Sequence, residues 1–300
     1  MRAQKAGSFD IRFFFKPQKP VPYGRVKVEV AGQDFSELLT EKDRKIVRRQ
    51  WKGLKSRKGE RAYSQAGAIG SLYEASGNKF AFRPTEFKVS SAAYQTRPRR
   101  TMSAKVYDQM RVSAVACMAV LGDGRFVVQK RSGKVSLGEG LLDSSAAGYA
   151  KIKKGATIDF EAAAFEKLGR ELGVRGKMIR GISLAGVHSS GADCSGTFDF
   201  IVKTGLTQRQ ILAAADPHYV GGLEFVRPED LPGFIFSHFV EKKDIVPEGC
   251  AAMLACLPHA RFLQECASLS RAGKKILFGS LRKGEFVPAK KQPFRAEKRA

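Results

Sequence analysis

The stretch from Asp143 to Val174, DSSAAGYAKIKKGATIDFEAAAFEKLGRELGV, constrains the fold more than any other part of the chain. It combines a tight turn, a glycine-bearing loop and apolar residues at helical spacing from about Ile158 to Leu172. Gly173 follows the last of these residues, and glycine in that place commonly ends a helix. The stretch therefore predicts a loop and an amphipathic helix around which the other elements can be arranged.

Patterns typical of strands lie on both sides of this stretch. Before it, the apolar run VSAVACMAVL, the turn GDG and the run RFVVQKRS predict two buried strands joined by a tight glycine turn. After it, strands are predicted at ISLAGVHSS, TFDFIVKTG and GLEFVRP, with helices at TQRQILAA and from Asp244 to Leu257. Such a mixture predicts an α/β (α+β) fold with a mixed sheet.

The front of the chain has a different character. RVKVEVAG alternates apolar and charged residues as a half-buried strand does, and Gly77 with Asn78 separates two alternating runs in the manner of a hairpin. Between them, FSELLTEKDRKIVRRQWKGLKSRKGER has helical spacing and a basic outer face. We predict a flexible basic arm over residues 1–20, a strand-rich accessory layer over 21–105, a main domain over 106–268 and a basic tail over 269–300.

The charge of the chain favours anionic partners. Its 53 Lys and Arg against 29 Asp and Glu give a formal net charge of +24. Phosphorylated small molecules, RNA, DNA and anionic membranes all satisfy this condition. No apolar run of about 18 residues and no signal-peptide pattern occurs, which predicts a cytoplasmic protein without a membrane partner. Five cysteines without C-x-x-C spacing argue against a disulfide framework and a zinc site.

The order of these elements resembles the Nudix superfamily of diphosphate-cleaving enzymes, whose signature is G-x5-E-x7-R-E-U-x-E-E-x-G-U. Gly148 matches the first glycine, Gly173-Val174 matches the last pair, and Thr157 stands in the N-cap place. The resemblance implies a Nudix-like α/β/α sandwich with a mixed sheet, preceded by the accessory layer. SLYEA and FAFRPTEFKVSSA are also similar to the front section of UDP-glucose and UDP-galactose hydrolases.

The resemblance implies a chemistry as well as a fold. Diphosphate hydrolysis needs divalent ions to neutralise oxygens and to lower the pKa of a bound water, and helical carboxylates three or four residues apart suit Mg²⁺. The resemblance therefore implies Mg²⁺ or Mn²⁺ held by Glu171 and Glu166, which would also be the catalytic residues. The residues it implies for substrate binding are Arg131, Lys167, Arg170, Lys154 and Gly148.

The signature is altered where metal ions bind. Counting back from Gly173, Lys167 and Arg170 stand where two metal-binding glutamates are expected, and of that set only Glu171 is retained. Two cations in place of two anions weaken Mg²⁺ binding but suit direct contact with phosphate. Two hypotheses follow, a hydrolase of a nucleoside diphosphate-linked substrate such as a nucleotide sugar, or a catalytically silent Nudix-fold protein that binds RNA through its basic arms.

Several polar residues have two interpretations from sequence. Glu171 is either a metal ligand or a helix-end glutamate paired with Lys167 at i, i+4. His188, in GVHSSGADCSG, lies either at the mouth of a pocket or in a structural role, and Asp193 and Asp199 share this ambiguity.

Overall fold

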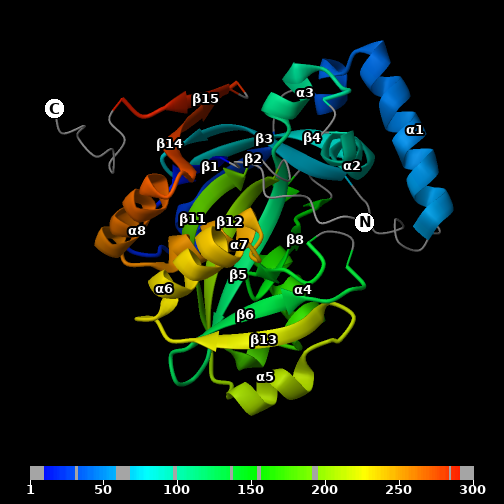
Figure 1. Cartoon of the computed structure of the whole chain (residues 1–300). Helices are drawn as coiled ribbons and strands as arrows, with labels where there is room; N and C mark the ends of the chain where they lie inside the picture. Colours follow the sequence, from blue (N-terminus) through cyan, green and yellow to red (C-terminus); the bar gives the residue numbers. More distant parts are fainter. Residues whose placement is uncertain are drawn as a thin grey trace.

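The computed structural model describes residues 10–30, 33–58, 68–96, 100–135, 138–153, 157–190, 195–283 and 285–290. These residues form one large mixed sheet with helices packed on its faces (Figure 1). The predicted mixed α+β fold class is therefore confirmed.

The most continuous apolar run of the chain forms strand β5, Val112–Val120, and eight of its nine residues are buried. Its apolar residues run almost without interruption because a strand that is covered on both faces does not alternate apolar and polar residues. β5 runs parallel to β12 (Ser195–Thr204) and antiparallel to β8 (Ala146–Tyr149). The sheet continues through β6 (Phe126–Arg131), β7 (Leu142–Asp143), β11 (Ile179–Ser190) and β13 (Val220–Val226).

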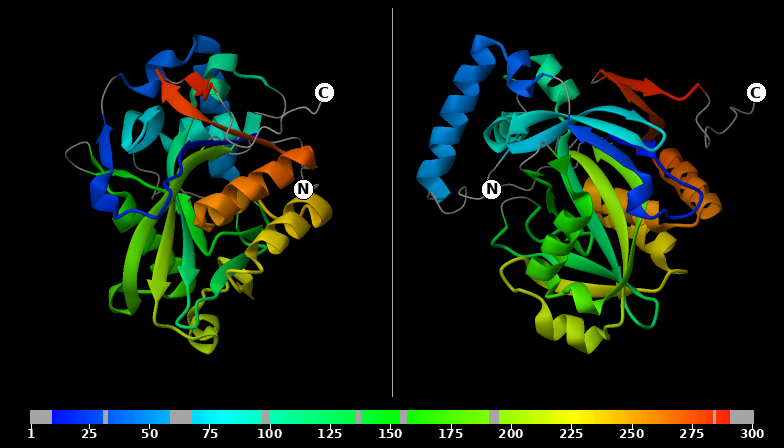
Figure 2. Two further views of the ribbon diagram at one scale, coloured as in Figure 1. Left: turned by 90° about the vertical axis from the view of Figure 1, so that its left-hand side faces the viewer. Right: turned by 180° about the vertical axis from the view of Figure 1, so that it is seen from behind.

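Helices cover both faces of β5 and make a three-layer sandwich, as the two views of Figure 2 show. Val115 and Cys117 share a core cluster with the apolar face of α4 (Phe160–Leu172). Ala116 and Met118 belong instead to the cluster of α7 (Pro247–Cys256). The remaining helices of the sandwich are α5 (Gln208–Ala214), α6 (Leu231–Phe236), a π-helical segment Ser237–Lys242 and α8 (His259–Arg271).

Parts of the predicted arm and tail are strands of the sheet. β1 (Asp10–Phe15) pairs with β11 on one side and with β14 (Lys275–Arg282) on the other. Ile11, Phe13 and Ile276 are buried, and β14 also pairs with β15 (Glu285–Pro288). The predicted flexibility of residues 1–20 is wrong for Asp10–Phe15, because this short apolar run is buried by pairing with strands distant in the sequence. The division into domains stays a prediction.

The predicted hairpin is formed by β3 (Ala68–Ser76) and β4 (Lys79–Glu86), and Gly77 in its turn has a φ of +58°. β2 (Lys27–Val30) pairs with β4, while β3 pairs with both β14 and β5 and so connects two strands that lie far apart in the strand order. The run after Glu86 is not a strand but α2 (Phe87–Thr96), since Val89, Ala92, Ala93 and Thr96 form one buried helical face.

The accessory region is therefore a mixed layer rather than a strand-rich one. Besides α2 it contains α1 (Glu41–Lys58), the 3-10 segments Tyr23–Arg25 and Phe35–Leu38, and α3 (Ala104–Gln109). Its own core cluster joins Phe35–Leu38, α1, α2 and α3 to β3 and β5, whereas Tyr23 packs against the cluster of α4. None of the helices in the described part of the chain is long and apolar enough to cross a membrane.

Candidate functional site

The predicted site is built on α4 and the strands beside it. The Asp159 carboxylate caps the helix by accepting a hydrogen bond from the backbone N–H of Ala162 at 2.9 Å, and Gly173 ends it with a φ of +66°. Thr157, predicted as the cap, lies instead in the short strand β10 (Thr157–Ile158), which pairs with β9 (Ile152–Lys153). With Phe160, Ala164, Leu168 and Leu172 buried in the core, α4 directs its charged residues toward β8 and β6.

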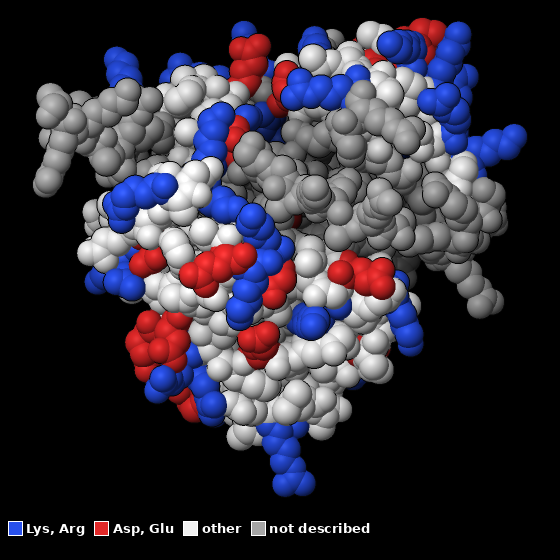
Figure 3. Space-filling model, in the orientation of Figure 1, with Lys and Arg blue, Asp and Glu red and all other residues white. Residues whose placement is uncertain are grey.

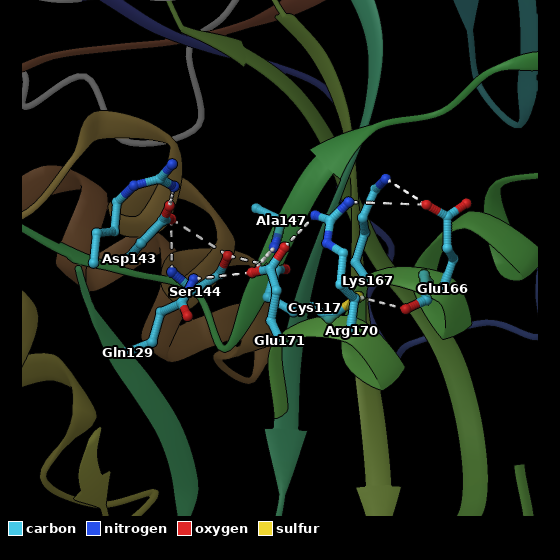
Figure 4. A network of polar contacts seen from close by, with 12 residues as sticks. Cys117, Gln129, Asp143, Ser144, Ala147, Glu166, Lys167, Arg170 and Glu171 are labelled. Atoms are coloured by element: carbon cyan, nitrogen blue, oxygen red, sulfur yellow. Dashed lines mark hydrogen bonds and ion pairs between the residues drawn. The ribbon is translucent and has the colours of Figure 1, made fainter. Parts of the chain in front are cut away.

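Glu171 is a buried carboxylate surrounded by protein donors (Figure 4). One oxygen accepts hydrogen bonds from Gln129 Nε2 at 3.3 Å and from the backbone N–H of Ala147 at 3.4 Å. The other accepts from Arg170 Nη2 at 2.7 Å. Burial raises the pKa of Glu171 above its ordinary value, although Arg170 and Gln129 favour the charged form. Both of its oxygens are therefore used inside the protein.

Glu166 lies five residues earlier on the same helix and is largely exposed, with 57% of its side chain accessible. Its Oε1 accepts a hydrogen bond from Lys167 Nζ at 3.0 Å and lies 3.9 Å from Arg170 Nη1. Burial works to raise the pKa of Glu166, but Lys167 and Arg170 outweigh it and the pKa is lowered. Figure 4 shows the Arg170 guanidinium between Glu166 and Glu171, in contact with both carboxylates.

Lys167 is buried beneath β8, and only 7% of its side chain is exposed. Burial lowers its pKa, the positive charge of Arg170 lowers it further, and Glu166 acts in the opposite direction. A Cβ atom at Gly148 would lie 2.8 Å from Lys167 Cε, so the glycine leaves space for the lysine stem. The Arg170 guanidinium also lies 4.7 Å from the centre of the Tyr219 ring, which holds it in place.

Arg131 takes part in a neighbouring ion pair. Its Nη1 lies 2.5 Å from Oδ2 of Asp143, which is buried at the end of the short strand β7. Burial opposes the charge on Arg131, but Asp143, with Glu171 and Glu248 nearby, raises its pKa. Sequence reasoning missed Asp143 as this partner, although an arginine at the end of a buried strand needs a counter-ion. Lys154, also predicted for substrate binding, lies outside the described residues.

His188 and Asp199 form a separate buried pair on adjacent strands. Their Nδ1 and Oδ2 atoms are 2.8 Å apart, both side chains are almost fully buried, and the Phe13 ring packs beside the imidazole. A position at the mouth of a pocket is therefore wrong for His188, and the structural interpretation applies. Asp193 lies outside the described residues.

The residues around α4 do not fit a divalent ion. Among the described residues no three His, Cys, Asp or Glu side chains converge as metal ligands. Glu171 and Glu166 each face a cation, and the Arg170 guanidinium occupies the space between them. Their predicted metal-binding and catalytic roles stay predictions that this geometry does not favour.

A surface hollow lies elsewhere on the molecule. It has a volume of about 710 Å³ and is lined by the turn after β5 and by α5, with Asp123, Arg125, Gln208, Arg209 and Leu212 among its residues. No residue predicted for the site lines it. Arg125 is paired with Asp123 at 2.6 Å, and the hollow is separate from the residues predicted to bind a ligand.

Comparison with known proteins gives a partial likeness. No family model matches the chain, and no curated protein matches it. DR0079 from Deinococcus radiodurans is 21% identical, and the match covers 49% of this chain and 82% of that one with a TM-score of 0.37. A MutT protein from Methanosarcina mazei Go1 is 13% identical, covering 52% of this chain and 96% of the other with a TM-score of 0.33. These values establish neither a family nor an activity.

Proposed function

We propose that this chain is a Nudix-type protein that binds the diphosphate of a nucleoside diphosphate-linked ligand at α4, using side-chain cations in place of metal ions. The observation that supports this most is the convergence of Lys167 and Arg170 on one oxygen of Glu166. Two cations around a single exposed oxygen form an environment suited to a phosphate oxygen.

Glu166 occupies this environment as an internal substitute for phosphate. Its carboxylate is largely exposed, whereas Lys167 beneath it is buried and Arg170 is fixed against Glu171 and Tyr219. The exposed anion can rotate into solvent while the two cations stay in position. A ligand phosphate that displaced it would meet a preorganised pair of donors.

The same contacts argue against hydrolysis through a metal platform. A divalent ion at Glu171 would have to displace Arg170, Gln129 and the Ala147 backbone N–H from a buried carboxylate. It would also lie beside two fixed positive charges, which repel it. We therefore expect binding of nucleotide sugars or similar ligands without cleavage that depends on Mg²⁺ or Mn²⁺.

Calorimetric titration tests the proposal, with pyrophosphate, UDP-glucose and ADP-ribose as probes. We expect Glu166→Gln to raise the affinity for pyrophosphate about 2–5-fold, since a half-exposed ion pair is worth about 1 kcal/mol or less. Lys167→Gln and Arg170→Gln should lower the affinity. Glu161→Gln is the matched control, because Glu161 lies on the same helix and forms no ion pair with a described residue.

The outcome separates binding from catalysis. A catalytic or metal-binding Glu166 would lose function when changed to Gln, whereas a displaced anion gives tighter binding. Release of phosphate from UDP-glucose with Mg²⁺, abolished by Glu171→Gln, would contradict the proposal and restore the hydrolase hypothesis. Failure of all three probes to bind the unmodified chain would contradict it as well.

A further inference from the structure

Helix α1 lies at the outer edge of the molecule in the views of Figure 1 and Figure 2. One of its faces contributes Ile46 and Val47 to the core cluster of the accessory region, next to α2. The buried Asp43 carboxylate fixes its first turn by accepting hydrogen bonds from Ser103 and from Thr40. These contacts anchor the helix, and its charged outer surface faces solvent.

A row of unneutralised cations runs along this outer surface. Lys42, Lys45, Arg49 and Lys52 are exposed, and none has an ion pair or hydrogen bond to a side chain in the described part of the chain. Their spacing of three, four and three residues places them on one line, because residues three and four apart are neighbours on a helix. At 1.5 Å per residue the row is about 15 Å long. We call it the α1 row.

Two arginines of the same helix provide a contrast. Arg48 Nη2 lies 2.9 Å from one oxygen of Glu41, and Arg44 Nη1 lies 3.8 Å from the other. Glu41 therefore lies between two arginines and partly neutralises them, while the α1 row has no such partner. The Lys and Arg side chains that gather on the upper right edge of Figure 3 lie over α1.

We propose that the α1 row binds the sugar-phosphate backbone of a nucleic acid without reading its base sequence. A row of separate, solvated point charges suits a ladder of phosphates, and each contact releases counter-ions condensed on the nucleic acid. The only aromatic residue of the helix is Trp51, which is half-buried against Phe87, so a base-stacking platform is missing. Contacts of this kind position a protein on a backbone but do not specify a sequence.

An anionic membrane fits the same surface less well. Membrane-surface helices insert large apolar side chains beside their cations. The large exposed apolar side chains among the described residues are Leu212 and Val287, and neither belongs to α1. The surface is also distinct from the predicted basic arms, since residues 10–15 and 275–282 of those arms are strands of the sheet.

The test measures fluorescence anisotropy of a labelled single-stranded RNA and a labelled DNA duplex over a salt series, using the full chain. Lys45→Gln with Arg49→Gln removes two charges from the α1 row. Arg44→Gln with Arg48→Gln is the matched control, because it removes the same charge from exposed positions of the same helix but leaves the α1 row intact. Unfolding temperatures establish that both variants fold.

We expect the first variant to lower the slope of log affinity against log salt by about 0.7–0.9 for each lost contact, and the control to leave it nearly unchanged. RNA or DNA of scrambled sequence should bind equally well, and pyrophosphate should not compete. Lys42→Gln with Lys52→Gln should reproduce the effect of the first variant if the row acts as a unit.

Three results would overturn the inference. Equal slopes in the variant and the control would show that only net charge matters. If neither the RNA nor the DNA duplex bound at low salt, a nucleic acid would not be the partner of this surface. Binding to anionic vesicles that is stronger than binding to both nucleic acids, and that depends on the α1 row, would assign the surface to a membrane.

Discussion

Helices α4 and α1 both carry clustered cations, but the clusters have opposite surroundings. In α4, Lys167 and Arg170 are packed against protein and each lies beside a carboxylate. In α1, the cations of the α1 row are exposed and have no acidic partner among the described residues. Both helices add to the net positive charge of the chain, but paired charges cancel each other's field. Only the unpaired, exposed cations of α1 therefore attract an anionic partner from solution.

The difference determines which property each cluster controls. Buried paired charges affect stability, since removal of one partner leaves the other desolvated and unpaired. Exposed unpaired charges affect association and its dependence on salt, with little effect on folding. Reversing the charges in α4 should therefore change stability most, whereas changes at the surface of α1 should act mainly on binding.

The largest effect is expected for Lys167→Glu combined with Arg170→Glu, which places glutamates where the Nudix signature has them. Without metal, these carboxylates would crowd Glu166 and Glu171, and we expect a loss of about 3–5 kcal/mol in the free energy of unfolding. Mg²⁺ should then raise the unfolding temperature of the variant but not of the unmodified chain. Calorimetry with and without Mg²⁺ measures both effects.

Arg175→Glu combined with Lys177→Glu is the control for that variant, because it reverses the same charge at exposed positions just beyond α4. It should leave stability nearly unchanged in both conditions. If Mg²⁺ stabilised the unmodified chain as strongly as the reversed variant, the side-chain cations would not have taken the place of a metal ion.

The next effect concerns Asp43, a buried charge in the first turn of α1. Asp43→Ala leaves donors of Ser103 and Thr40 without their acceptor, which should cost about 2–3 kcal/mol. Burial works to raise the pKa of Asp43, but these hydrogen bonds lower it below 3.8, so its contribution is present above that pH and is lost in acid. Urea unfolding between pH 3 and pH 7 should show the difference from Asp43→Ala shrinking as the pH falls.

Asp108→Ala on the exposed face of α3 is the comparison for this change. This substitution should lower the free energy of unfolding only slightly at any pH. A loss for Asp43→Ala no greater than that of Asp108→Ala would mean that the first turn of α1 is not anchored through Asp43.

A third, smaller effect is the pH dependence contributed by Glu171. Burial raises its pKa above 4.5, so its contribution to stability is complete below that pH and declines as the pH rises through the folded-state pKa. Glu171→Gln removes this decline. Over the pH range above 4.5 in which Glu171 titrates, the free energies of unfolding of the variant and of the unmodified chain should diverge by at most about 1.4 kcal/mol per pH unit. A constant difference across the window would indicate that Arg170 and Gln129 fully offset the effect of burial.

The elements of the fold differ in how far the sequence alone could predict them. The core elements were predictable because each has a sequence pattern contained within its own residues. β5 forms from a continuous apolar run, and α4 forms from a stretch with helical spacing of apolar residues. The roles of β1 and β14 were not, since each is a short run whose burial depends on pairing with distant strands. The start of α2 was missed because an alternating run continues into residues that form a helical face.

The candidate site was predictable in place but not in pairing. Counting from Gly173 located Glu166, Lys167, Arg170 and Glu171, and the structure brings them together. It also pairs Arg131 with Asp143 and gives Glu171 to Arg170 instead of Lys167. Such choices depend on which side chains share a buried space in three dimensions, and neither spacing nor charge count contains that information.

The smallest effect is expected for Glu41→Gln, which tests whether pairing alone separates the arginines of α1 from the α1 row. The change frees Arg44 and Arg48, whose ion pairs with Glu41 are exposed and contribute little to stability. If the freed arginines reach phosphate, the salt slope of nucleic-acid binding should steepen by up to about 1.4, at about 0.7 for each contact to a single strand. Glu74→Gln on β3 removes the same negative charge at an exposed position without freeing an arginine, and it should leave the slope unchanged. A steeper slope in both variants would mean that overall charge, rather than the pairing of individual side chains, governs binding along α1.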